Sequence, residues 1–194
     1  MNSQNMNQSV DINNIIGKKT LILSDFNTSR LTLIVKIIEE LNNSAHSKKV
    51  IWFDFAPKLK IKNEIAIGGR IQDHTDQFDK LHHIKTRLTY EPRICAKNRS
   101  EIIKYAINNS RAITTGLTEF RKRPTKIMVM NYIHLYLQKG PLALLMKTIN
   151  TSDTFIGTAF RGKCPFNDFE DGITRRERKL VDKLSLKMDD VIYL

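Results

Sequence analysis

The sequence predicts a three-layer α/β domain built around a central, mostly parallel β-sheet. Short apolar runs alternate along the chain with stretches in which apolar residues recur every three or four positions, the pattern of strands alternating with amphipathic helices. The run at residues 49–55 is almost continuously apolar, which is typical of a parallel strand covered by helices on both faces. Helices that connect such strands make right-handed crossovers, so we expect one sheet between two helical layers.

The first elements are a buried strand over residues 20–23, a polar turn over residues 24–28, and a helix. Asn27 or Thr28 can cap this helix, because either side chain accepts a hydrogen bond from a free N–H group of the first turn. The run at residues 42–44 ends it. Its apolar face follows helical spacing and comprises Leu31, Ile34, Val35 and Ile38.

A second strand over residues 49–55 is followed by a less regular region. Residues 58–62 alternate lysine with apolar residues and fit an exposed extended segment, and residues 65–70 fit a short strand that ends in a turn. Residues 84–90 alternate until Pro92 stops them, which favours a local excursion or hairpin.

The second half of the chain repeats the strand–helix alternation. Asn98 or Ser100 can cap the next helix, and Asp171 or Thr174 the last one. In order, the predicted elements are a helix over 98–113, a strand over 126–131, a helix that opens at Gly140-Pro141, a strand over 154–160, a helix over 173–186 and a strand over 191–194.

Composition places the chain among globular proteins. Its 194 residues fit one domain, and 41% hydrophobic with 27% charged residues suffice for a core. We expect residues 1–14, rich in Asn, Gln and Ser, to be a disordered leader before a domain over 15–194. No apolar run is long enough to span a membrane, and no secretory signal is visible. Two isolated cysteines, Cys95 and Cys164, fit a cytoplasmic protein.

The net charge of +12 is concentrated in the middle of the chain. Residues 51–100 carry ten Lys and Arg against six Asp and Glu (+4), and residues 101–150 carry eight against two (+6). This excess favours an anionic partner: a nucleotide, a nucleic acid or an acidic protein surface. A solvated basic face without a partner accounts for it equally well.

The turn after the first strand is the main candidate site. A strand that enters a helix through a short turn presents free N–H groups and the positive end of the helix dipole, which together attract phosphate. In phosphate-binding loops the turn reads G-x-x-x-x-G-K-[ST]. The same eight positions here are Ser24, Asp25, Phe26, Asn27, Thr28, Ser29, Arg30 and Leu31.

These residues resemble the start of the P-loop NTPases, and in particular an archaeal group of P-loop ATPases. Asp25, Asn27, Thr32 and Leu33 follow that group's pattern, and segments 136–140 and 172–178 are also similar to it. Its diagnostic residues are replaced, so the resemblance implies a degenerate Walker A motif. Arg30 keeps the charge of the usual lysine, whereas Leu31 cannot bind Mg²⁺ as the usual hydroxyl does.

The resemblance also assigns roles beyond the turn. Asp54 ends the second strand, where P-loop proteins with this arrangement carry a carboxylate that organises Mg²⁺ or the attacking water. It equally fits a strand-end carboxylate that caps a turn. Asn131 ends the third strand, where a Walker B motif carries aspartate, and its uncharged amide implies weak metal binding.

Three other groups have both a functional and a structural interpretation. On a helix, Asp76, Asp79 and His83 would share a face and could bind a metal, although a solvated acidic face explains them as well. His134 lies in an apolar run and fits a hydrogen-bonded core residue. The basic runs 121–124 and 175–178 could hold phosphates, but acids interleave the second, which favours a salt-bridged surface, and neither run has aromatic neighbours for base stacking.

We therefore expect a nucleotide-binding protein with weak or lost hydrolysis. The expected ligand is ATP or another nucleoside triphosphate, with Mg²⁺ held by degenerate ligands. Two alternatives remain open: a pseudo-NTPase scaffold for a protein partner, and a basic nucleic-acid-binding module using residues 51–150. The expected contacts to the nucleotide come from Asn27, Thr28, Ser29, Arg30, Leu31 and Thr32, with Asp54 as the candidate catalytic residue.

Overall fold

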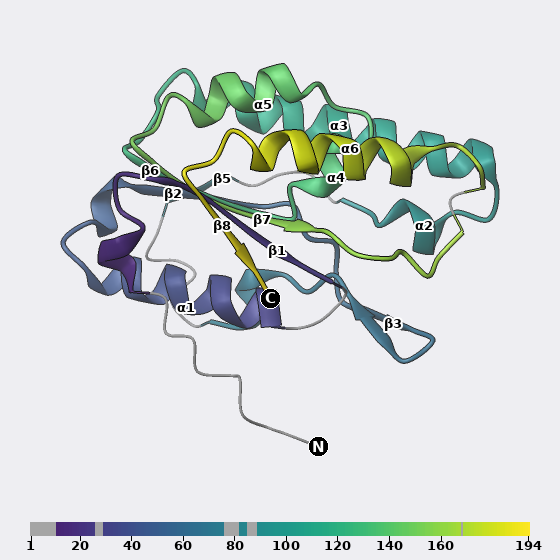
Figure 1. The fold of residues 1–194 in the computed structure, drawn as a ribbon, viewed down its shortest axis with the longest axis horizontal. Helices are drawn as coiled ribbons and strands as arrows, with labels where there is room; N and C mark the ends of the chain where they lie inside the picture. Colours follow the sequence, from purple (N-terminus) through teal and green to yellow (C-terminus); the bar gives the residue numbers. More distant parts are fainter. Residues whose placement is uncertain (1–10, 26–28, 76–81, 85–88, 168) are drawn as a thin grey trace.

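The computed structural model describes residues 11–25, 29–75, 82–84, 89–167 and 169–194, and these form a three-layer α/β fold (Figure 1). Six parallel strands make the central sheet, in the order β5-β2-β6-β7-β1-β8. The predicted fold class is therefore confirmed. The strands are β1 (Lys19–Ser24), β2 (Val50–Asp54), β5 (His82–Ile84), β6 (Ile127–Asn131), β7 (Thr154–Phe160) and β8 (Asp190–Tyr193).

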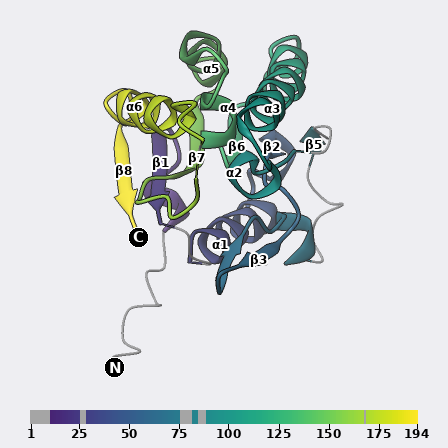
Figure 2. The same ribbon diagram turned by 90° about the vertical axis from the view of Figure 1, so that its right-hand side faces the viewer.

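The helices divide between the two faces of the sheet (Figures 1 and 2). Helix α1 (Ser29–Asn43) covers one face, and the opposite face carries α3 (Arg99–Phe120), α4 (His134–Leu137), α5 (Leu142–Ile149) and α6 (Ile173–Ser185). Each face has its own apolar core, because the buried strands β6 and β7 send alternate side chains to opposite sides. Met128 belongs to the core under α3, for example, and Val129 to the core over α1.

The region between β2 and α3 differs most from the prediction. A two-stranded antiparallel hairpin of β3 (Lys60–Lys62) and β4 (Ile65–Ile67) projects beside α1, and β3 is exposed, as the alternating lysines predict. Most of the local excursion or hairpin expected over 84–90 is not described; the described strand β5 includes Ile84 and pairs in parallel with β2. Residues 85–88 lie outside the described part of the chain.

Several observed element boundaries also differ from the predicted ones. Residues 1–10 of the expected leader lie outside the described residues, but Ile12–Asn14 forms a 3-10 turn whose Ile12 is buried against α1. Helix α3 runs to Phe120, and Asn98 caps it by accepting a hydrogen bond from the N–H of Glu101. Two short helices, α2 (Pro92–Cys95) and α4, were not predicted, because four residues are too few for helical periodicity to appear.

The predicted cap of α6 is also wrong. Gly172 occupies the N-cap with φ of 79°, a left-handed conformation that glycine adopts without strain, and no side chain caps the helix. Asp171 instead pairs with Lys139 at 3.1 Å. No helix among the described residues is long and apolar enough to cross a membrane.

Candidate functional site

The candidate site lies at the carboxyl edge of the sheet, where β1 and β7 are neighbours. Strand β1 leads to α1 on one face, and β7 leads to α6 on the opposite face. Open α/β sheets bind ligands outside the carboxyl ends of adjacent parallel strands whose following chains leave toward opposite faces, and we call this position beside β1 and β7 the crevice. The exposed Asp25 follows β1 there, and its carboxylate lies where a Cβ on Gly162 would be. A Cβ at position 162 would therefore displace this carboxylate.

Helix α1 begins at this crevice, as the strand–turn–helix pattern predicts. Phe26, Asn27 and Thr28 of the turn lie outside the described residues, and so does the side chain of Ser29. The described part starts with the backbone of Ser29, the first residue of the helix. It then places the side chains of Arg30, Leu31 and Thr32.

Arg30 contributes a buried positive charge to the site. Its side chain is only 3% exposed although it stands in the first turn of α1. The guanidinium carbon lies 4.6 Å from the centre of the Tyr132 ring, and Nη1 is buried without a hydrogen-bond partner among the described residues. None of the described carboxylates forms an ion pair with it. A buried cation of this kind favours an anion beside it.

The two following residues differ in exposure. Leu31 is half-buried, and a Cβ on Gly69 would come within 2.8 Å of its Cδ2 atom. Gly69 has φ of 99°, so the loop after the hairpin needs glycine there both for its conformation and for its close approach to α1. Thr32 is exposed. Of the predicted nucleotide contacts that the structure describes, only Arg30 is a buried polar side chain at the helix start.

Asp54 lies at the end of β2, as predicted, and both of its oxygens accept hydrogen bonds. The N–H of Ile71 donates to Oδ2 at 2.7 Å, and Oδ1 accepts from the N–H of Ala56 and from Nδ2 of Asn131, both at 3.0 Å. Burial raises the pKa of this carboxyl to about 6, against the opposing effect of these hydrogen bonds. The bond to Ala56 also matches the turn-capping interpretation of Asp54.

Asn131 continues this hydrogen-bond chain across the sheet. Its Oδ1 accepts from the hydroxyl of Thr158 at 2.6 Å, and the N–H of Tyr132 donates to that hydroxyl oxygen at 3.0 Å. Asp54, Asn131 and Thr158 thereby connect β2, β6 and β7 at their carboxyl ends. A Mg²⁺ ion bound by Asp54 and Asn131 would displace protein donors from their oxygens. The described residues contain no cluster of three or more His, Cys, Asp or Glu side chains suited to a metal.

Tyr132 was not predicted to take part, yet it holds the parts of the site together. Its φ of 64° is unusual for a bulky residue and turns the chain sharply at the end of β6. Its hydroxyl accepts a hydrogen bond of 2.8 Å from the N–H of Gly68, while its ring contacts Arg30 on α1 and lies 4.6 Å from the ring of His134. No sequence signal reports a positive φ at a tyrosine.

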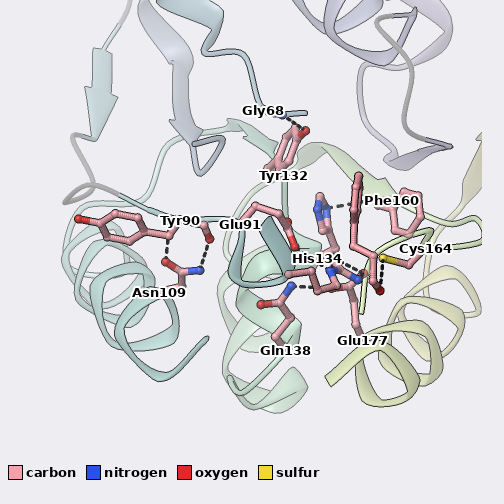
Figure 3. A network of polar contacts seen from close by, with 12 residues as sticks. Gly68, Tyr90, Glu91, Asn109, Tyr132, His134, Gln138, Phe160, Cys164 and Glu177 are labelled. Atoms are coloured by element: carbon pink, nitrogen blue, oxygen red, sulfur yellow. Dashed lines mark hydrogen bonds and ion pairs between the residues drawn. The ribbon is translucent and has the colours of Figure 1, made fainter. Parts of the chain in front are cut away.

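His134 is a fully buried core residue, as expected (Figure 3). Its Nδ1 accepts a hydrogen bond of 3.1 Å from the N–H of Phe160, so Nε2 carries the proton of the neutral ring. Burial, together with the charges of Arg30 and Arg93, holds the pKa of His134 well below its usual value. The ring is neutral at physiological pH and does not balance a buried anion or cation.

A second polar network, also missed from the sequence, lies below His134 (Figure 3). Arg93 is fully buried and donates to Glu91 at 2.7 Å and to Glu177 of α6 at 3.1 Å, and Gln138, the residue after α4, donates to Glu177 at 2.8 Å. The network joins α2, α4 and α6. Charged residues so far apart in sequence give no local pattern that would reveal their pairing.

The remaining predicted groups do not join the site. Asp76 and Asp79 of the possible metal cluster lie outside the described residues, and the ring of His83 stacks on Trp52 at 4.6 Å. The basic run 121–124 follows α3 at the amino edge of the sheet, just before β6 begins, whereas the crevice is at the carboxyl edge. The basic charges of residues 51–150 therefore spread over different parts of the surface.

Comparison with known proteins adds no relative. The sequence matches none of the known protein-family models, and no curated protein matches it either.

Proposed function

We propose that this protein binds a nucleotide through its phosphates at the crevice between β1 and β7, as a P-loop NTPase-like protein whose hydrolysis is weak or lost. The observation that carries the proposal is the buried Arg30 guanidinium in the first turn of α1, with no carboxylate partner among the described residues. Its stacking on Tyr132 contributes about 2 kcal/mol when desolvated. Burying an unpaired ion costs several kcal/mol, so a bound phosphate supplies the missing compensation.

The surroundings of Arg30 favour binding of a phosphate over binding of other anionic groups. The start of a 15-residue helix brings its dipole and free N–H groups to the same crevice. The crevice lies at the point where the chain directions reverse, which is the usual place for nucleotides in open parallel sheets. ATP and GTP both carry the triphosphate that these groups would hold, and nothing at the described crevice selects a base.

The proposal of weak hydrolysis rests on Asp54, the carboxylate at the end of β2, and on its neighbours. Phosphoryl transfer requires Mg²⁺ and a positioned nucleophile. Both oxygens of Asp54 and the amide of Asn131 already bond to protein groups, and Leu31 supplies no hydroxyl. We therefore expect nucleotide binding that depends little on Mg²⁺, with phosphate release close to the uncatalysed rate.

Thermal unfolding with and without nucleotide tests the proposal. At about 5 mM ATP and a Kd of about 0.1 mM, linkage gives about 2 kcal/mol, which raises Tm by about 5 °C for a chain of this size. Arg30→Met keeps a long side chain in the buried place but removes the charge, so it should abolish the shift. Lys36→Met removes an exposed charge from the same helix and should leave the shift intact.

The outcomes are distinct. A Tm that does not change in about 10 mM ATP or GTP would overturn the proposal and favour the alternative of a scaffold for a protein partner. An equal shift in the wild type and in Arg30→Met would place nucleotide elsewhere. Rapid, Mg²⁺-dependent release of phosphate would contradict the proposed loss of hydrolysis while leaving binding in place.

A further inference from the structure

The outer face of α6 carries a row of exposed cations away from the nucleotide crevice. Arg175, Lys179 and Lys183 are four residues apart, so they lie on one side of the helix and cover about 12 Å of its length. All three are exposed. Helix α6 lies on the outside of the layer opposite α1, above the sheet edge that β1 and β8 form (Figure 2). This row is therefore open to a large partner.

The acids that interleave these cations in the sequence do not neutralise them. Glu177 points inward and is buried against Arg93. Asp182 pairs with Arg161, the residue after β7, at 2.6 Å. The expectation of a salt-bridged surface is therefore wrong for this face. Among the described residues, none forms an ion pair with the three exposed cations of the row.

The row borders a shallow surface hollow of about 590 Å³. The hollow starts at residues 170–172 and follows α6 to Lys183, with Arg176 and the half-buried Leu180 also in its wall. Two acids, Glu170 and Asp171, lie at its end, and Asp171 is paired with Lys139. Four cations in the wall thus face two acids, and the positive end of the helix dipole adds to them.

We propose that this face of α6 binds the phosphate backbone of a nucleic-acid duplex, independently of base sequence. A row of cations on an exposed, slightly hollowed face suits a regular line of phosphates, and a span of about 12 Å covers three to four nucleotide steps of one strand. None of the described residues that line the hollow is aromatic, so they offer no platform for stacked bases of a single strand. The net charge of +12 supports the attraction at long range.

Fluorescence anisotropy with a labelled duplex of about 24 base pairs, measured between about 50 and 200 mM salt, tests this proposal. The test variant is the triple substitution Arg175→Gln, Lys179→Gln and Lys183→Gln, which keeps helix-compatible side chains. The control is Lys36→Gln, Lys48→Gln and Lys49→Gln, which removes the same charge from exposed positions on and beside α1. Circular dichroism checks that both variants are folded.

The wild type should bind the duplex with a steep salt dependence. Loss of three phosphate contacts should reduce the slope of log K against log salt by about 2.7 and weaken binding more than tenfold at about 0.1 M salt. The control should change the slope by less than about 1. Arg30→Met should bind the duplex like the wild type, which separates this surface from the nucleotide crevice.

Three results would overturn the proposal. One is the absence of duplex binding by the wild type at about 50 mM salt. Another is equal weakening by the α6 variant and the control, which would mean that net charge alone acts. The third is tighter binding of a single strand of the same length than of the duplex, because a backbone-only surface gains nothing from unpaired bases.

Discussion

Replacing Glu177 by glutamine should change how stability depends on pH without breaking the fold. Glu177 lies in the buried network of Arg93, Glu91 and Gln138 (Figure 3). Two carboxylates there face one guanidinium, so one acid is in excess. Burial raises the pKa of Glu177 to about 7, although the charge of Arg93 opposes the rise. The protonated form of Glu177 is therefore the better suited to this site.

The size of the change in stability follows from the raised pKa of Glu177. The pKa of about 7 in the native state exceeds the usual 4.5 by 2.5 units, and at 1.36 kcal/mol per unit this is about 3 kcal/mol. Because the native state holds the proton more tightly than the unfolded chain, stability is greatest below pH 4.5 and falls as the pH rises to 7. Most of this loss, about 2–3 kcal/mol, falls between pH 5 and pH 8.

Glutamine reproduces the protonated acid with little rearrangement. Arg93 keeps Glu91 as a charged partner at 2.7 Å, so its charge stays compensated. The new amide N–H group would face Nε2 of Gln138, but Oε1 of Gln138 has no hydrogen-bond partner among the described residues. Rotation of the Gln138 amide brings that oxygen to the new donor. We expect Glu177→Gln to match the wild type at pH 5 and to exceed its stability at pH 8.

Urea unfolding at pH 5 and pH 8 measures this difference. Asp182→Asn on the same helix is the control, because its pair with Arg161 is partly exposed and contributes less than about 1 kcal/mol. The control should retain the wild-type loss of stability between the two pH values. Equal wild-type stability at pH 5 and pH 8, or a Glu177→Gln variant that is several kcal/mol weaker than the wild type at pH 8, would refute the reasoning.

Three further predictions concern single positions. Asp54→Asn should remove a second pH-dependent loss of about 1 kcal/mol between pH 5 and pH 8, since burial raises the pKa of Asp54 to about 6; urea titrations in which this loss persists would contradict it. Gly157→Ala should lower stability by about 1–3 kcal/mol, because its Cβ would lie 2.5 Å from the Phe155 ring, and an unchanged Tm in calorimetry would count against this packing. Tyr132→Phe leaves the N–H of Gly68 without its acceptor and should lower the urea midpoint by an equivalent of about 1 kcal/mol, whereas no change would mean that water replaces the hydroxyl.

The strands and their order along the chain could be predicted because each is a short apolar run with its own boundaries. Residues 49–55 and 154–160 contain β2 and β7 almost to the residue. The pattern also predicts that these strands are parallel, since covered strands need crossover helices. It could not predict that β5 joins β2, because His82–Ile84 is too short to show a period and its pairing is set by tertiary contacts.

The candidate site could be predicted only in part. The strand–turn–helix pattern correctly placed the start of α1 and the position of Asp54 at the carboxyl edge. It did not predict Tyr132, whose positive φ depends on what surrounds it. Nor did it predict the inward orientation of Glu177. In a helix whose positive and negative side chains alternate, the charged residues of both signs normally face solvent. Helical spacing does place Glu177 on the same side of α6 as the buried Ile173 and Val181, but the charge of glutamate argues against burial unless its distant partner Arg93 is known.

A comparison of two buried arginines supports the proposal of a ligand at the crevice beside β1. Arg93 and Arg30 are each at most 3% exposed, and each lies against an aromatic ring. Arg93 has two carboxylates within 3.1 Å, so its charge is compensated inside the protein. Arg30 contacts Tyr132, and its Nη1 has no hydrogen-bond partner among the described residues. The protein thus compensates one buried cation with its own carboxylates. The other lies beside the start of α1 without such a carboxylate among the described residues, and this difference is the reason we propose an external anion for Arg30.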